Sequence, residues 1–211
     1  TIHPLVKALN TELNVWYLDD GTVGGTVEET LAALDTVRSM GQDLGLHLNT
    51  AKCEDAILGA DEVDRDQAMI RFDMAAPGIQ ELTREKAVLL GSPLSAEAVA
   101  VVLTEKTKKM EDLSKRLLLL TAHSAFFLLR ASVSIPRLTY SLRCAPTWKQ
   151  KGLLESYDKA LKVALEGILN LELTPEQWAQ SSLPVKLGGL GVRHAMDIAV
   201  PCFLASVHRF R

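Results

Sequence analysis

The sequence predicts an α+β protein, with short strands around one helix in its first part and a mostly helical second part. Before residue 95, short apolar runs are separated by Asp, Gly and Pro, which is typical of strands and turns. From Ala96 to about Asn170, apolar residues recur every three or four positions, as in buried helices. Only Ile135-Pro136 and Ala145-Pro146 interrupt that pattern. Strands mixed with a helix, followed by a run of helices, indicate an α+β arrangement.

The composition is that of a globular protein. Apolar residues make up 47% of the 211 residues and charged residues 23%, so the chain can bury a core. Three scattered cysteines favour reduced thiols and an intracellular protein. The first residues do not resemble a signal peptide, and the apolar runs are too short to span a bilayer. We therefore expect an intracellular protein, cytoplasmic or nuclear, that is neither secreted nor bound to a membrane.

The net charge of −3 conceals two oppositely charged halves. Residues 1–104 contain 7 Lys and Arg against 17 Asp and Glu, a balance of −10. Residues 105–211 contain 16 against 9, a balance of +7. The acidic half is suited to bind cations, and the basic half is suited to bind phosphates.

A hairpin is predicted near the N-terminus, after the end of a helix over residues 4–10. Leu13 to Leu18 forms its first strand, and Asp20-Gly21 is expected to form the turn. Asp19 and Asp20 then lie together at the tip, where carboxylate oxygens are suitable ligands for Mg²⁺. The alternative is a simple solvated turn, since Asp and Gly are common turn residues.

The next element is a helix that begins at a capping box, Thr26 with Glu29, and ends at Gly45. Strands are predicted at 46–48, 69–72 and 87–90, and Gly91-Ser92-Pro93 closes the last of them. Asp61 to Asp66 contains four acids in six residues; it is either a cation-binding loop or a solvated loop.

Basic residues follow the predicted helices of the second part. Phosphate contact and an ordinary solvated helix face both explain them. Near the end, the glycine-rich segment 183–192 does not fit a dinucleotide-binding fingerprint and is interpreted as a turn before a helix over residues 196–208. The candidate nucleic-acid-binding residues are Lys106, Lys108, Lys109, Lys115, Arg116, Arg130 and Arg137.

Four segments in this order resemble the later part of a reverse transcriptase domain of the non-LTR retrotransposon type. The first matches the Tyr-x-Asp-Asp box of the family, and the second its Asn- and Lys-containing block. The third resembles its primer-grip turn, and the fourth a Gly-Gly-Leu-Gly segment near the end of such reading frames. The segments are Tyr17-Leu18-Asp19-Asp20, Leu48-Asn49-Thr50-Ala51-Lys52, Leu89-Leu90-Gly91-Ser92-Pro93 and Leu183-Pro184 with Gly188-Gly189-Leu190-Gly191.

The resemblance implies a partial palm over residues 1–94 and a helical thumb-like region over residues 95–211. It implies that Asp19 is the principal Mg²⁺ ligand and that Asp20 is the weaker or structural partner. Lys52 is then a catalytic residue near the pyrophosphate, unless it is a plain surface lysine. Leu90 and Gly91 hold the primer end in this comparison, and the thumb follows the duplex through its phosphates.

Part of the family pattern is missing from these residues. The fingers, the first catalytic strand and the upstream aspartate of the family have no counterpart, and polymerases of this kind hold two metals with three carboxylates. We therefore expect a fragment of an RNA-directed DNA polymerase, a nucleotidyltransferase that is catalytically incomplete alone and binds an RNA or DNA duplex or hybrid. Two alternatives remain: a domesticated or relic helical protein-interaction module, and one half of a split polymerase completed by a partner chain. A homodimer joined near the apolar strand 15–18 is also expected.

Overall fold

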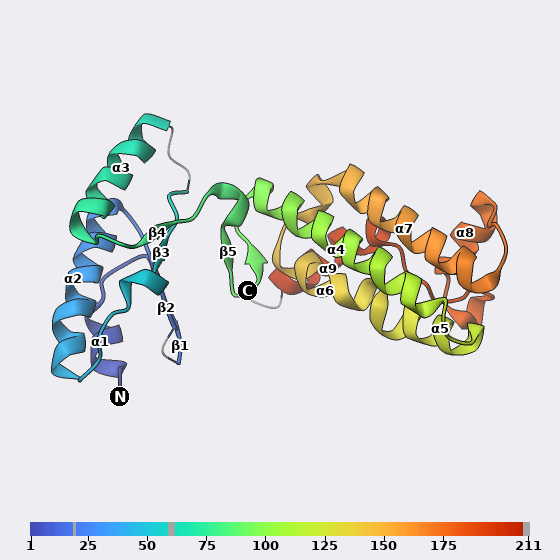
Figure 1. The fold of residues 1–211 in the computed structure, drawn as a ribbon, viewed down its shortest axis with the longest axis horizontal. Helices are drawn as coiled ribbons and strands as arrows, with labels where there is room; N and C mark the ends of the chain where they lie inside the picture. The colour runs from blue at the N-terminus through green and yellow to red at the C-terminus, as the bar shows by residue number, and fades with distance from the viewer. Residues whose placement is uncertain (19, 59–61, 209–211) are drawn as a thin grey trace. The chain divides into compact units, whose positions relative to one another are not determined.

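The structure, a computed structural model, describes residues 1–18, 20–58 and 62–208. It is mostly helical (66%) and has small two-stranded sheets, so the predicted α+β class is confirmed with helices as the bulk of the chain. The chain forms two compact units, Thr1–Leu82 and Thr83–Arg211 (Figure 1). Among the described residues, no helix has the length and apolar character needed to cross a bilayer.

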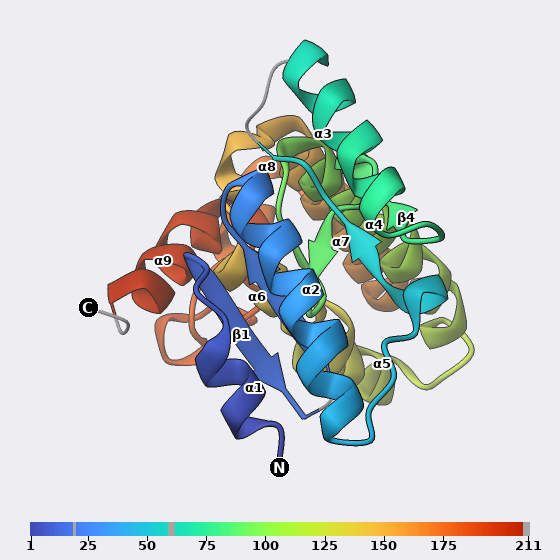
Figure 2. The same cartoon turned by 90° about the vertical axis from the view of Figure 1, so that its left-hand side faces the viewer.

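The first unit contains three helices and two of the small sheets in its described part (Figure 2). β1 and β2 pair antiparallel, whereas β3 and β4 pair parallel. Its elements are α1 (His3–Ala8), β1 (Leu13–Tyr17), β2 (Asp20–Gly24), α2 (Val27–Asp43), a 3₁₀ turn (Thr50–Lys52), β3 (Glu54–Asp55), α3 (Glu62–Ala75) and β4 (Gln80–Glu81).

A small core joins α1 and α2 to the inner face of the β1–β2 hairpin. Leu5 and Leu9 are buried there, and Trp16 of β1 packs against them. Asn14 donates from Nδ2 to the Val6 carbonyl (2.9 Å) and accepts from the indole Nε1 of Trp16 (2.8 Å). Asn14 therefore satisfies a carbonyl at the end of α1 and orients the indole.

The turn of the hairpin differs from the prediction. Tyr17 pairs with Asp20, and Trp16 pairs with Gly21, so Asp20 and Gly21 belong to β2 and the predicted Asp20-Gly21 turn is wrong. The chain turns instead from Leu18, whose φ is 58°. The Trp16 ring lies over Gly21, and this inward packing sets the register in place of the local turn preference.

We expect Gly21→Ala to destabilise the first unit by about 1–3 kcal/mol, because overpacking forces neighbouring atoms apart. A Cβ at this position would lie 2.6 Å from a ring carbon of Trp16. Urea unfolding of the full chain, followed by tryptophan fluorescence, measures the effect.

Gly152→Ala is the matched control, since nothing lies within 4 Å of its added Cβ. It should be neutral or stabilising by up to about 1 kcal/mol. Equal stability of the two variants would contradict the Trp16–Gly21 contact.

The predicted capping box is confirmed, whereas the strand predicted after this helix is wrong. Thr26 Oγ1 accepts from the Glu29 backbone N–H, and the Glu29 carboxylate accepts from the Thr26 N–H. Gly45 follows α2 with a φ of 72°. The Leu46 N–H donates to the Gly41 carbonyl (2.8 Å), so it closes the helix end instead of joining a strand.

The strand predicted at 69–72 is also wrong, because these residues lie within α3. The 14 residues of this helix include neither Gly nor Pro, so nothing breaks the helix before or after the short apolar run at 69–72. Arg71 pairs with Glu28 of α2 (2.6 Å), and Arg65 pairs with Glu81 of β4. The acidic stretch predicted as a loop is therefore partly helical; Asp61 lies outside the described residues.

The second unit begins with a hairpin and continues as a bundle of helices (Figure 1). Its elements are a 3₁₀ turn (Arg84–Lys86), β5 (Val88–Leu89), β6 (Ser92–Pro93), α4 (Ala96–Leu117), α5 (Ala122–Leu128), a π-helical turn (Leu129–Val133), α6 (Ile135–Cys144), a 3₁₀ turn (Thr147–Lys149), α7 (Lys151–Leu169), α8 (Pro175–Ser182), a 3₁₀ turn (Val185–Leu187) and α9 (Ala195–His208).

The main core lies between the long helices of this unit. α4 packs against α7, and α6 packs against α9. The predicted interruptions are present, because α6 begins at Ile135 and ends at Cys144.

The strand predicted at 87–90 is present in part, as β5, whereas Ser92-Pro93, predicted as part of its closing turn, forms β6. This hairpin packs on α4 and α6. The hairpin therefore groups with the helices, and the units divide after Leu82 instead of after residue 94.

Candidate nucleic-acid interface

The two acids of the N-terminal hairpin, Asp19 and Asp20, are the candidate Mg²⁺ ligands. Asp19 lies outside the described residues. Asp20 is exposed at the start of β2, and Lys52 is exposed at the end of its 3₁₀ turn. Within the described part of the chain, no hydrogen bond or ion pair joins Asp20 to Lys52, and no cluster of three or more His, Cys, Asp or Glu could hold a metal. The Mg²⁺ site therefore stays a prediction.

The β5–β6 turn has the geometry of a tight hairpin. Leu90 and Gly91 have φ values of 48° and 79°, and a two-residue turn with positive φ at both positions is the type that matches strand twist. Tyr140 of α6 donates its hydroxyl hydrogen to the Leu90 carbonyl (2.6 Å). Sequence reasoning missed Tyr140, because 50 residues separate it from the turn.

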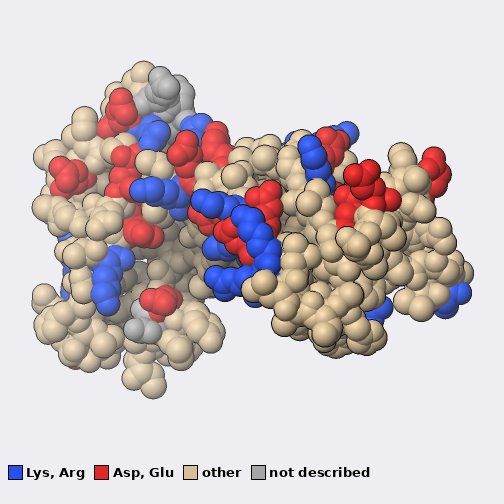
Figure 3. Space-filling model, turned by 45° about the vertical axis from the view of Figure 1, so that its right-hand side comes forward, with Lys and Arg blue, Asp and Glu red and all other residues tan. Residues whose placement is uncertain are grey.

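The basic residues of α4 stand among acids. Four of the five candidate cations are exposed and Lys106 is half-buried. Lys109 lies 3.9 Å from Glu105, and Lys115 lies 3.2 Å from Asp112. In Figure 3, charged side chains of both signs lie beside one another, and broad areas carry neither. The positive electrostatic potential around α4 is therefore weaker than its lysines alone would produce.

The chain from Leu113 to Leu154 is the most uniformly basic part of the second unit. It contains seven Lys and Arg and no Asp or Glu. Arg130, Arg137 and Arg143 are exposed, and no acidic side chain pairs with them among the described residues. The Arg130 guanidinium lies 5.8 Å from the centroid of the Phe126 ring, within the range of a cation–π contact. These three arginines are available to a phosphate backbone.

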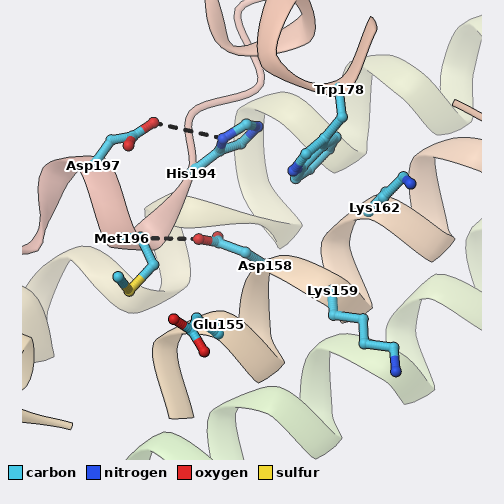
Figure 4. Close-up of a pocket in the computed structure, with 8 residues that line it drawn as sticks. All are labelled: Glu155, Asp158, Lys159, Lys162, Trp178, His194, Met196 and Asp197. Carbon is cyan, nitrogen blue, oxygen red and sulfur yellow. Dashed lines mark hydrogen bonds and ion pairs between the residues drawn. The ribbon is translucent and has the colours of Figure 1, made fainter. Parts of the chain in front are cut away.

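A pocket of about 390 Å³ lies at the junction of α7, α8 and α9 (Figure 4). Asp158 of α7 is buried in its wall and accepts from the backbone N–H groups of Ala195 (2.6 Å) and Met196 (3.0 Å). These groups are unpaired donors at the start of α9, so Asp158 acts as a cap supplied by another helix. Burial raises the pKa of Asp158, although both N–H groups oppose the shift.

His194 closes the same pocket from the other side. Its ring stacks on Trp178 of α8, with centroids 4.0 Å apart, and its Nδ1 lies 3.5 Å from Asp197 (Figure 4). The lining contains Lys159 and Lys162 as well as acids, so no single sign of charge dominates it. These contacts hold α7, α8 and α9 together, so we call this cluster a structural clamp.

Sequence reasoning missed this clamp, because Asp158 lies 37 residues before Ala195 and no local pattern links them. No known protein family, curated protein or solved structure matches this chain.

Proposed function

We propose that this chain is the nucleic-acid-binding portion of an RNA-directed DNA polymerase of the non-LTR retrotransposon type. It binds the backbone of an RNA–DNA hybrid or a duplex, and by itself it does not polymerise. The main support is the charge balance of the two units, which is −10 for residues 1–82 and +7 for residues 83–211. A basic helical unit attached to an acidic one is suited to bind a polyanion through the basic unit.

The polymerase assignment rests on the order of the four sequence segments. In this proposal Asp19 and Asp20 bind Mg²⁺, Lys52 lies near the pyrophosphate, and Leu90 and Gly91 hold the primer end. The tight turn at Leu90 and Gly91 supports the last role, because a rigid hairpin tip can position a strand end.

Binding of an RNA–DNA hybrid should weaken steeply as salt rises, because neutralised phosphates release counterions. Replacing Lys106, Lys108 and Lys109 together by Gln should make the slope of log affinity against log salt shallower by up to about 2.7, if all three touch phosphate. Fluorescence anisotropy with a labelled hybrid measures both slopes. Lys7→Gln, in the acidic unit, is the control and should leave the slope unchanged. Absence of binding, or binding indifferent to salt, would contradict the proposal.

A second candidate function is a helical protein-interaction module. An exposed apolar stripe on α9 supports it, formed by Val200, Leu204 and Val207 at helical spacing. The two functions are separated by a direct comparison. Salt-dependent retention on immobilised hybrid, with none on an acidic protein, favours the first function, and the reverse result favours the second.

A split polymerase and a homodimer both require an uncovered surface on the first unit. Leu13, Val15 and Tyr17 occupy the outer face of β1 and are exposed in the single chain. Trp16 points to the opposite face, so the outer face is the one available to a partner or a second copy.

A further inference from the structure

Tyr140 is an exposed aromatic residue on the basic surface of α6. Its side chain is 48% exposed, and it lies within the acid-free stretch from Leu113 to Leu154. Arg137 and Arg143, three positions before and after it, lie beside it on the helix surface. The helix therefore places an exposed aromatic ring between two positively charged side chains.

The ring of Tyr140 is held by the neighbouring hairpin. Its hydroxyl donates to the Leu90 carbonyl (2.6 Å), and its ring passes 3.6 Å from the Cβ position of Gly91. A tyrosine hydroxyl is a hydrogen-bond donor at neutral pH. Partial burial and the neighbouring Cys144 raise the pKa of Tyr140 further. A ring fixed at its hydroxyl end loses little rotamer freedom when a ligand stacks on it.

We propose that Tyr140 is a stacking platform for an unpaired base of a single-stranded nucleic acid, with Arg137 and Arg143 on the flanking phosphates. The inference rests on the proposed nucleic-acid binding and names the form of nucleic acid that this surface takes. Aromatic rings set in a basic groove bind single strands in this way, because every base has a π-face. A continuous duplex keeps its bases stacked inside and offers no free face to Tyr140.

A nucleic acid fits this surface because it supplies a phosphate for each arginine and a planar ring for Tyr140 in every nucleotide repeat. A protein partner would have to place two acids and a planar side chain at the same spacing. Tyr140 also holds the hairpin in place, so the test must separate the ring from the hydroxyl.

Two variants make that separation. Tyr140→Phe removes the hydrogen bond to Leu90 and keeps the ring. Tyr140→Leu removes both. Phe127→Leu is the control for losing an exposed ring in the same acid-free stretch, because Phe127 has no hydroxyl to hold it. Circular dichroism establishes that each full-length variant keeps its helices.

The probes are a short single-stranded DNA containing 2-aminopurine and a blunt-ended RNA–DNA hybrid. We expect Tyr140→Leu to bind the single strand about tenfold more weakly than the wild type. It should also lose the quenching of 2-aminopurine that stacking causes, while hybrid affinity stays within about twofold. Tyr140→Phe should weaken single-strand binding less than Tyr140→Leu does, by about twofold to threefold, because the ring is kept but no longer held by Leu90, and it should keep the quenching. Phe127→Leu should stay within about twofold for both probes and keep the quenching. Arg137→Gln with Arg143→Gln should reduce the salt slope on the single strand by up to about 1.4.

The outcomes distinguish this inference from the proposed function. Unchanged single-strand affinity and quenching in Tyr140→Leu, with salt-dependent binding intact, overturns the stacking platform alone. If Tyr140→Leu and Tyr140→Phe weaken the binding of both probes to the same extent, the inference is also overturned. Residue 140 would then act only through the hydrogen bond that holds the hairpin. No salt-dependent binding of either probe overturns both proposals. Retention of an acidic protein that depends on Tyr140, without nucleic-acid binding, assigns the surface to a protein and overturns both as well.

Discussion

Asp158→Ala should lower the free energy of unfolding of the second unit by roughly 3 kcal/mol, from the loss of two hydrogen bonds to a charged group. The carboxylate holds the backbone N–H groups of Ala195 and Met196, and Asp158 itself is buried. Alanine leaves both donors at the start of α9 unpaired. Urea unfolding of the full chain, followed by circular dichroism at the helical band, measures the change.

Glu155→Ala is the matched control for this prediction. Glu155 lies one turn earlier on α7 and lines the same pocket, but it is exposed. Its removal should change stability by no more than about 0.5 kcal/mol. A loss of similar size in both variants would show that the pocket charge matters, and not the cap on α9.

The same carboxyl predicts a pH dependence of stability. Burial raises the folded-state pKa of Asp158, so the folded chain binds its proton more readily than the unfolded chain. The part of the stability that depends on this proton is therefore complete below the ordinary carboxyl range and is lost as pH rises through the raised pKa. The two hydrogen bonds to Ala195 and Met196, which Asp158→Ala removes, are a separate contribution that the ionised carboxylate keeps. The stability of the wild type relative to Asp158→Asn should fall over this interval, and a relative rise would contradict the assignment.

Leu161→Ala should also destabilise the second unit, by about 2–5 kcal/mol. Leu161 of α7 is fully buried in the core between the long helices. Truncation loses the transfer free energy of the side chain and leaves a cavity, which packed helices fill only in part. The midpoint of urea unfolding falls, and the slope of the transition stays the same if the denatured state is unchanged.

Val163→Ala is the corresponding control on the same helix. Val163 is 59% exposed, so its truncation removes little buried area and changes stability by about 0.5 kcal/mol or less. If Leu161→Ala and Val163→Ala were equally stable, the side of α7 that contains Leu161 would not be the side packed in the core.

Features whose causes lie within a few residues could be predicted from the amino-acid sequence. The capping box of Thr26 and Glu29, the end of that helix at Gly45 and the interruptions around Pro136 and Pro146 all formed as predicted. Each depends on backbone groups that nearby side chains satisfy or on the restricted backbone of Pro. The division into an acidic and a basic part is likewise a property of composition.

Features whose partners are distant in the sequence depend on the tertiary structure and could not be predicted locally. The hairpin turn moved from Asp20-Gly21 because Trp16 packs inward over Gly21, and the strand predicted at 69–72 became part of α3. Asp158 reaches the start of α9, and Tyr140 reaches Leu90. Local preferences differ by about 1 kcal/mol or less per residue, so burial and long-range hydrogen bonds outweigh them where they compete.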